Sequence, residues 1–284
     1  MIHVRTPEEI AIIRENALMV SATLTEVAKV LRPGITTQQL DTLAETFIRD
    51  NGGVPSFKGY GPRHSPFPAS LCISINDVVV HGFPGSYVVK EGDVISVDCG
   101  FNRNGYHGDH AYTFAVGEVP DEVLHLLRVT KDALDLGVAA AKANNRVGDI
   151  SFAIEHYTHK KFGYGVVREL VGHGVGKKLH EEPNVPNYGR RGDGKKLKEG
   201  YVLAIEPMIN LGVREVFTED DQWTIRTQDG KVSAHFEHTV VVRKNRGEAL
   251  SNFASIQEAE RANANLSDRQ WTPEFAPQGV GEML

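Results

Sequence analysis

The sequence predicts an α+β fold of two similar halves, in which a curved antiparallel sheet is covered by helices on one face. The first observation behind this prediction is an internal repeat: KEGDVISVD, which ends at Asp98, resembles KEGYVLAIE, which ends at Glu206. The second is that another carboxylate follows each copy, Asp109 in GDHAYTFAV and Glu237 in FEHTVVV. We therefore expect a pseudo-twofold axis between the halves, with the shared carboxylates on the concave face of the sheet.

The repeat also sets the expected domain organisation. The halves span about residues 1–118 and 119–246, and together they form one domain. Residues 247–284 are a polar C-terminal extension without a counterpart in the repeat, and their role is unknown. Within the extension, SIQEAERANANL is compatible with a short helix, whereas WTPEFAPQGVGEML is expected to be irregular.

A long helix is expected near the start of the chain. Thr6 can cap it, Pro7 suits its first turn and Glu9 can complete a capping box. Pro33-Gly34 is expected to stop it. The apolar residues that recur at helical spacing between these signals are Ile10, Ile13, Ala17, Val20, Leu24, Val27 and Leu31.

A second helix and two strands are expected next. Thr36 and Gln39 can form another capping box, and Gly52-Gly53 ends the helix. The segments CISIN and DVVVHGF are strand-like. The apolar face of this helix is expected to consist of Leu40, Leu43, Phe47 and Ile48.

A β-hairpin is expected where DVISVDCGF is followed by HAYTFAV, because the residues Asn-Arg-Asn-Gly between them are a turn signal. If Arg103-Asn104 is the centre of the loop, Asp98 and Asp109 face each other directly across the two strands. Two opposed carboxylates repel, so a positive group is expected between them. In the second half, Glu237 is expected to follow a hairpin turn at Asp229-Gly230.

The four carboxylates predict a metal site. Carboxylates that point from apolar strands toward one centre are very costly unless they are compensated, and no regular pattern of lysine or arginine flanks them. Carboxylate-rich sites with a little imidazole suit divalent Mn, Fe, Co or Zn, often as a pair about 3.5–4 Å apart. His173, which has glycines on both sides in LVGHGVG, is the candidate imidazole ligand.

The stretch GHGVGKKLHEEPN was also compared with two other site motifs, and neither fits. HEEPN begins like the zinc motif HExxH, but Asn184 replaces the second histidine and Pro183 resists a helix. A phosphate-binding loop would need GxxxxGK[ST] before a helix, which is absent. We therefore interpret these glycines as part of a narrow entrance beside the metal site.

Bulk properties restrict the class of protein. The chain has 284 residues and a net charge of −6, which does not suggest a general affinity for nucleic acid. Its two cysteines, Cys72 and Cys99, form no disulfide framework and favour a reducing compartment. No apolar run approaches the roughly 18 residues of a membrane span, and MIHVRTPEEI has no signal-peptide core. A soluble cytoplasmic protein is expected, with neither nucleic acid nor a membrane as partner.

Six motifs together resemble one known family. They are CISINDVVVHGFP, VDCG, YHGDHAYTF, GHGVGKKLHEEP, AIEPM and FEHTVVV, in this order. Over about residues 3–246 the chain resembles type I methionine aminopeptidases, which have the pita-bread metallopeptidase fold. The 33 residues from His173 to Glu206 leave no room for the long insertion of type II enzymes.

The resemblance implies a centre with two divalent metal ions per chain. Asp109 and Glu237 would bridge the two ions, Asp98 would bind one, and His173 and Glu206 would bind the other. It does not choose among Co, Mn, Fe and Zn.

The resemblance also implies roles for residues around the metal ions. Glu206 would be the proton shuttle for an attacking water. His180 would hydrogen-bond the scissile carbonyl or the tetrahedral intermediate, and His81 would contact the substrate nitrogen beyond the scissile bond. By motif position, the residues expected to line the methionine pocket are Tyr60, Phe67, Cys72 and Trp223.

The implied function is removal of the initiator methionine from nascent polypeptides with a small second residue. The enzyme is expected to be a monomer in the cytoplasm, and the ribosome is one place where it would meet these N-termini. Two alternatives stay open: a proline-directed peptidase of the same fold, which usually carries a separate N-terminal domain, and a metal-free binding module, which lost ligands would mark. The chain departs from the common type I pattern in its longer GYGPRHSPFPASLC segment, and in Leu179 where phenylalanine is frequent.

Overall fold

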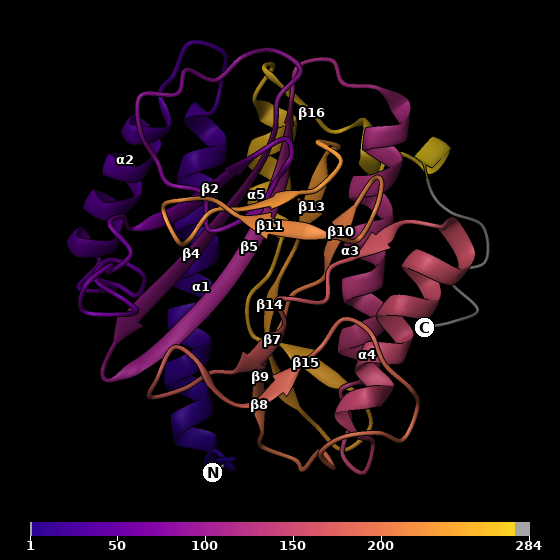
Figure 1. The fold of residues 1–284 in the computed structure, drawn as a ribbon. Coiled ribbons are helices and arrows are strands. Elements are labelled where there is room, and N and C mark those ends of the chain that lie inside the picture. Colours follow the sequence, from indigo (N-terminus) through magenta and orange to yellow (C-terminus); the bar gives the residue numbers. More distant parts are fainter. Residues whose placement is uncertain (1, 276–284) are drawn as a thin grey trace.

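The computed structural model describes residues 2–275 and contains helices followed by strands, twice over (Figure 1). The α-helices are α1 (Pro7–Val30), α2 (Thr37–Asp50), α3 (Asp121–Ala140), α4 (Val147–Glu155) and α5 (Ala254–Ala262), and the short helical turns are η1 (His156–Lys161), η2 (Arg269–Trp271) and η3 (Pro273–Phe275). The strands are β1 (Val54–Pro55), β2 (Leu71–Ile75), β3 (Val78–Val80), β4 (Val94–Arg103), β5 (Tyr106–Val116), β6 (Gly165–Val166), β7 (Gly172–Gly174), β8 (Glu181–Val185), β9 (Val202–Ile205), β10 (Met208–Asn210), β11 (Val216–Thr218), β12 (Ile225–Thr227), β13 (Ser233–His235), β14 (His238–Val242), β15 (Gly247–Ala249) and β16 (Leu266–Ser267).

The first two helices begin as the sequence predicts. In α1, Thr6 accepts a hydrogen bond from the backbone N–H of Glu9, and the Glu9 carboxylate accepts one from the backbone N–H of Thr6. Thr36 and Gln39 form the same capping box at α2. All seven apolar residues predicted for the first helix are buried. Such reciprocal caps satisfy backbone donors that the first helical turn leaves without partners.

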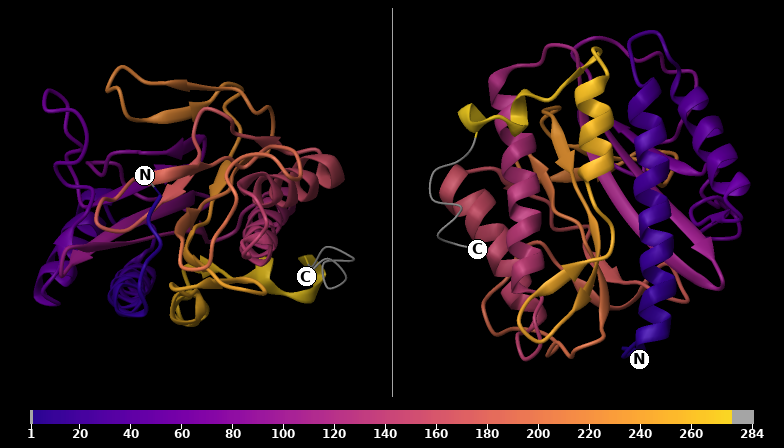
Figure 2. Two further views of the ribbon diagram at one scale, coloured as in Figure 1. Left: turned by 90° about the horizontal axis from the view of Figure 1, so that it is seen from below. Right: turned by 180° about the vertical axis from the view of Figure 1, so that it is seen from behind.

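The strands form antiparallel ladders that helices cover on one face. Two sheets have five strands each, one centred on β4 and β5 and the other with the order β15-β14-β9-β7-β8, and two smaller sheets have three strands each. Seen from behind, α5 lies between α1 and α3 against the sheets (Figure 2). The opposite face carries strand ends and loops. No helix among residues 2–275 combines the length and the hydropathy needed to cross a membrane.

The two halves meet where β5 lies beside β14. The backbone N–H of Asp109 donates to Oγ1 of Thr239 over 3.0 Å, and that hydroxyl donates to the backbone oxygen of Asp109 over 2.7 Å. The rings of His110 and His238 stack with 4.9 Å between centroids and 12° between planes. His110 and His238, which are equivalent in the repeat, therefore contact each other across the junction, as a pseudo-twofold relationship requires.

The described part of the C-terminal extension packs against the same core. β15 pairs with β14, and β16 pairs with β5. The helix predicted in SIQEAERANANL is confirmed as α5, where the buried carboxylate of Glu260 accepts hydrogen bonds from Tyr112 and Trp271. Of WTPEFAPQGVGEML, Trp271 ends the short turn η2, Pro273–Phe275 form η3, and the last nine residues lie outside the described residues.

The predicted register of the first hairpin is wrong by two residues, because the loop centre lies one residue further along the chain. Asn104 and Gly105 both have positive φ, 57° and 75°, and they form the two-residue loop themselves. Asp109 consequently pairs with Gly100, and Asp98 pairs with Ala111. The two aspartates lie on the same face as diagonal neighbours rather than directly opposite each other.

The predicted hairpin at Asp229-Gly230 is also wrong. The chain turns there, with Oγ1 of Thr227 donating to the backbone oxygen of Lys231 over 2.8 Å. However, β12 pairs with β11 and β3, whereas β13 pairs with β10. The turn therefore connects strands of two different sheets, which a local turn signal does not reveal.

Candidate metal centre

Five acidic and imidazole side chains converge from both halves of the molecule. Asp98 lies on β4 and Asp109 on β5, and both come from the first repeat. His173 lies on β7, Glu206 directly follows β9, and Glu237 directly precedes β14. Because β7 and β14 both pair with β9, the second half presents its three side chains from neighbouring strands.

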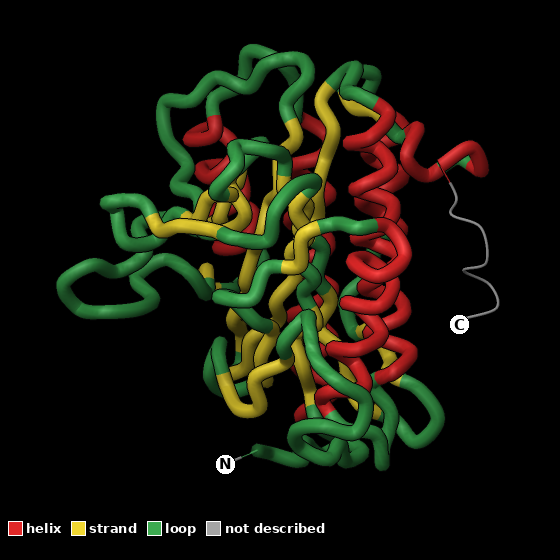
Figure 3. Tube along the Cα trace, turned by 45° about the vertical axis from the view of Figure 1, so that its right-hand side comes forward, coloured by secondary structure: helices red, strands yellow, loops and turns green. Residues whose placement is uncertain are grey.

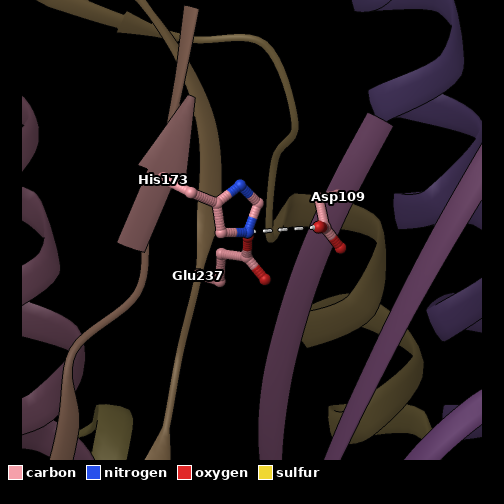
Figure 4. Close-up of side chains that lie close together, drawn as sticks. All are labelled: Asp109, His173 and Glu237. Carbon is pink, nitrogen blue, oxygen red and sulfur yellow. Dashed lines mark ion pairs between the residues drawn. The ribbon is translucent and has the colours of Figure 1, made fainter. Parts of the chain in front are cut away.

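Three of the five side chains form the tightest group. Ligand atoms of Asp109, His173 and Glu237 all lie within 4.8 Å of one another (Figure 4). His173 Nε2 lies 3.8 Å from Oδ2 of Asp109 and 3.4 Å from Oε1 of Glu206. Asp98 does not belong to this group of three, but its side chain lines the same cavity.

The tautomer of His173 favours a cation between its Nε2 and the neighbouring carboxylates. Its Nδ1 lies 2.9 Å from the backbone oxygen of Gly174, and a carbonyl oxygen can only accept, so Nδ1 carries the proton. Burial lowers the pKa of His173 to about 3, which keeps the ring neutral. Nε2 therefore directs a lone pair toward the carboxylates, an arrangement that is favourable with a metal ion between them.

The carboxylates are buried without compensating cations. Within residues 2–275, no lysine or arginine forms an ion pair with any of them. Atoms Oδ1 of Asp98, Oδ1 of Asp109 and Oε1 of Glu237 are buried without a hydrogen-bond partner. Burial raises the pKa of Asp98 to about 7 and that of Glu206 to about 8. Burial and the neighbouring carboxylates raise the pKa values of Asp109 and Glu237 well above their usual range.

The donor set fits divalent metal ions. Orphaned buried oxygens and one unprotonated imidazole nitrogen are ligands that first-row divalent metals accept, and metal charge would offset the repulsion among the carboxylates. Without a metal, the same groups are expected to hold protons near neutral pH, as the raised pKa values of Asp98 and Glu206 indicate.

One cavity brings together every site residue predicted from the sequence. Beside the five metal-ligand candidates, it is lined by His81, His180, Tyr60, Phe67, Cys72 and Trp223. Phe57 and Leu179, neither of which was predicted as a site residue, also line it. The cavity thus has a polar floor and an apolar wall.

Aromatic rings form the apolar wall. Phe67 packs edge to face against Trp223 and against Phe83, with 5.3 Å and 5.2 Å between centroids. Nε1 of Trp223 donates to the backbone oxygen of Ser65 over 3.0 Å, which joins the loop after β1 to the loop between β11 and β12. Figure 3 shows long loops projecting away from α3 and α4. Because Tyr60, Phe67 and Cys72 line the cavity, the longer GYGPRHSPFPASLC segment supplies part of the rim of the cavity.

The two non-ligand histidines that line the cavity have different neighbours. His180 packs against His173 with 4.1 Å between ring centroids, and its Nδ1 lies 2.6 Å from the hydroxyl of Tyr60. His81 has a φ of 61°, an unusual backbone conformation for a residue other than glycine, and its ring lies 5.9 Å from that of Trp223. Burial lowers the pKa values of both histidines, to about 4 for His81.

A wider groove runs on from the cavity. It has a volume of about 820 Å³, shares His173 and His180 with the cavity, and extends to Lys177, Glu182 and His3. An extended chain whose first residue lies in the cavity could therefore leave along this groove.

His235 is a polar neighbour that sequence reasoning missed. Its Nε2 lies 3.6 Å from Oε2 of Glu206, and the residue is 2% exposed. A signal was present, because His107-Gly108-Asp109-His110 and His235-Phe236-Glu237-His238 share the pattern His-x-acid-His.

Comparison with known proteins gives consistent matches. The model of metallopeptidase family M24 matches residues 11–244. The methionine aminopeptidase of Clostridium acetobutylicum is 50% identical over 252 residues, which are 88% of this chain and 99% of that protein. Methionine aminopeptidase 1 of Bacillus subtilis is 49% identical over 85% of this chain and 96% of its own length.

Solved structures of aminopeptidases are similar to this chain as well. The methionine aminopeptidase of Thermotoga maritima superposes with a TM-score of 0.85 at 41% identity, covering 89% of this chain and all of that one. The X-Pro aminopeptidase of the same organism has a TM-score of 0.68 at 23% identity, and the match covers 62% of its chain. This second likeness concerns the fold alone.

Proposed function

The chain belongs to metallopeptidase family M24, and on this premise we propose that it is a methionine aminopeptidase, which removes the initiator methionine from proteins with a small second residue. The observation that carries the proposal is the single cavity in which five candidate metal ligands meet an aromatic wall. The relatives named methionine aminopeptidase, matched over almost their whole length, support the same activity.

We propose that the centre holds two divalent ions. The four carboxylates carry more negative charge than a single divalent ion neutralises, and the one imidazole is neutral. Asp109 and Glu237, whose ligand atoms lie within 4.8 Å of each other, are the proposed bridging ligands. Asp98 would hold one ion, and His173 and Glu206 would hold the other. When bound, divalent ions supply Lewis-acid chemistry, which makes water a nucleophile near neutral pH and polarises a carbonyl oxygen.

The chain's own residues orient the substrate and move protons. Glu206, which lines the cavity beside the candidate ligand His173, is the proposed residue that takes a proton from the attacking water and passes it to the leaving amine. His180 is proposed to donate a hydrogen bond to the scissile carbonyl oxygen, and His81 to contact the nitrogen beyond the scissile bond. Preorganised donors at the developing oxyanion typically contribute about 10²–10³-fold in rate.

The apolar wall is the proposed methionine pocket. Tyr60, Phe67, Cys72 and Trp223 surround a space of limited size beside the acidic cluster. An unbranched thioether suits such a space, because it adapts to irregular gaps and makes favourable contacts with aromatic rings. The groove that runs past Lys177 is the proposed path for the rest of the substrate.

The proposed working form is a monomer in the cytoplasm that acts on nascent chains, with the ribosome as one setting where it would meet them. This chain's N-terminal segment contributes His3 and Arg5 to the outer groove. No second subunit is required to complete the cavity among the described residues.

Release of free methionine from Met-Ala-Ser and Met-Leu-Ser tests the proposal. Metal-stripped protein should be inactive, and addition of a productive divalent metal should restore cleavage of the first peptide far more than of the second. Cleavage of Xaa-Pro peptides in place of Met-Ala-Ser would favour the proline-directed alternative. No cleavage of any peptide by folded, metal-loaded protein would favour the binding module.

A further inference from the structure

We propose that His235 is a positioning residue of the metal centre, which holds Glu206 in place through a hydrogen bond from its Nε2–H to Oε2 of the carboxylate. The inference rests on the proposed function, because it assigns Glu206 to the same centre. It adds a residue that lies behind the cavity rather than among those that line it.

The first support is the anchoring of His235. Its backbone N–H donates to Oγ1 of Thr113 over 3.0 Å, and that hydroxyl donates to the backbone oxygen of His235 over 2.6 Å. The residue is 2% exposed, and its Nε2 is buried without a hydrogen-bond partner. A buried polar nitrogen without a partner is unfavourable, so a group at this position must take its proton or its lone pair.

The second support is a carboxylate oxygen close to that nitrogen. Oε2 of Glu206 lies 3.6 Å from Nε2 of His235, somewhat beyond the roughly 3.2 Å limit of an N–H···O hydrogen bond. With metal bound at the proposed centre the Glu206 carboxylate is ionised and only accepts, so a lone pair on Nε2 would face lone pairs on the oxygen. A proton on Nε2 makes the contact attractive, and a small rotation of the Glu206 side chain closes it.

The third support is the contrast with His173, the other imidazole beside Glu206. His173 Nε2 lies 3.4 Å from Oε1, and its Nδ1 proton is committed to the backbone oxygen of Gly174. Glu206 thus lies between two imidazoles. One offers a lone pair toward the metal site and the other is free to donate to the carboxylate from behind. Residues that hydrogen-bond to metal ligands typically contribute about 10–100-fold to metal affinity or activity.

The pseudo-repeat provides a matched control. His107 occupies the position equivalent to His235, two residues before Asp109. Its Nδ1 lies 2.8 Å from Oγ of Ser56, and its Nε2 lies 2.7 Å from Nδ2 of Asn102. Both of its nitrogens are engaged by neutral side chains, so its removal should leave the metal centre unaffected.

The test measures binding of Co²⁺ to stripped protein by calorimetry, together with the visible d–d spectrum of the bound ion. His235→Leu, which has no donor, should raise the Kd for Co²⁺ about 10–100-fold. His235→Gln keeps an N–H donor and should stay within about threefold of the wild type, as should His107→Leu, with an unchanged spectrum. His235→Met provides a second variant without a donor in case His235→Leu does not fold.

Two results would overturn the inference. Wild-type affinity in a folded donor-less variant would show that His235 does not support the centre. Equal losses in His235→Gln and His235→Leu, with an altered d–d spectrum, would show that His235 is a ligand and not a donor. Failure of the wild type itself to bind Co²⁺ would instead contradict the proposed metal centre, so the two failures are distinguishable.

Discussion

The hydroxyl of Tyr60 lies 2.6 Å from Nδ1 of His180, and the two rings meet edge to face with 5.0 Å between centroids. Burial raises the pKa of Tyr60, so its hydroxyl keeps its proton and is able to donate to Nδ1, which is the direction that the proposed role of His180 requires. The proton of the neutral imidazole must then reside on Nε2. Tyr60, expected only as part of the methionine pocket, thereby also sets the tautomer that His180 needs as a hydrogen-bond donor.

Tyr60→Phe should therefore lower kcat with little change in KM for Met-Ala-Ser. The aromatic ring stays in the pocket, and one hydrogen bond of about 0.5–1.5 kcal/mol is lost, which corresponds to roughly 2–10-fold in rate. His180→Ala defines the full contribution of the histidine and should cost more, while the protein stays folded. Unchanged kcat in Tyr60→Phe, beside a large loss in His180→Ala, would show that the tyrosine does not set the tautomer.

Metal affinity should weaken as the pH falls. In the metal-free protein the pKa values of Asp98 and Glu206 are about 7 and about 8, so both carboxyls hold protons over part of the neutral range. Metal binding must displace these protons, and the apparent Kd for Mn²⁺ should therefore rise steadily from pH 8 to pH 6. Calorimetry in buffers of different ionisation enthalpy counts the protons released. Glu206→Gln should release fewer, and a count independent of this substitution would contradict the assignment.

Metal-free protein should lose stability as the pH rises from about 5 to 9. Burial raises the folded-state pKa values of Asp98 and Glu206 above those of the unfolded chain. The unfolded state then releases these protons first, so stability is greatest below the unfolded pKa and is lost as the pH rises through the folded values. Thermal unfolding with and without Mn²⁺ checks this. Glu206→Gln should flatten the profile, and a metal-free Tm that rises over this range would contradict the account.

Gly61→Ala should impair the rim of the cavity more than Gly59→Ala. Both glycines have positive φ, 97° and 86°, so each substitution costs backbone strain of about 1–2 kcal/mol. Only at Gly61 would the added Cβ meet the ring of Trp223, at 2.6 Å, whereas Gly59 has open space. We expect KM for Met-Ala-Ser to rise several-fold in Gly61→Ala relative to Gly59→Ala. Equal kinetics in the two variants would show that the contact between the loop and Trp223 is irrelevant to substrate binding.

Local signals in the sequence were enough for α1, α2 and α5, whereas the residues that line the cavity beside the metal-ligand candidates were named from the resemblance to methionine aminopeptidases. The capping boxes at Thr6 and Thr36 depend on residues three positions apart, so the sequence states them directly. The repeat identified Asp98 and Glu206 as equivalent, because strand duplication keeps both the apolar alternation and the terminal carboxylate.

Features that depend on tertiary geometry could not be predicted in the same way. The register of the first hairpin depended on which two residues adopt positive φ, and Asn104-Gly105 does so in place of Arg103-Asn104. The different partners of β12 and β13 depend on sheet assembly across the whole chain. His107 and His235 look equivalent in sequence, yet only His235 faces a carboxylate of the centre.

Anomalous diffraction from crystals grown with Mn²⁺ would test the central claim most directly. The account predicts two peaks about 3.5–4 Å apart, with Asp109 and Glu237 contacting both and the remaining ligands divided between them. Asp98 should contact one ion, and His173 and Glu206 the other. Absence of any peak among these five residues in crystals of active, Mn²⁺-saturated protein would contradict the account.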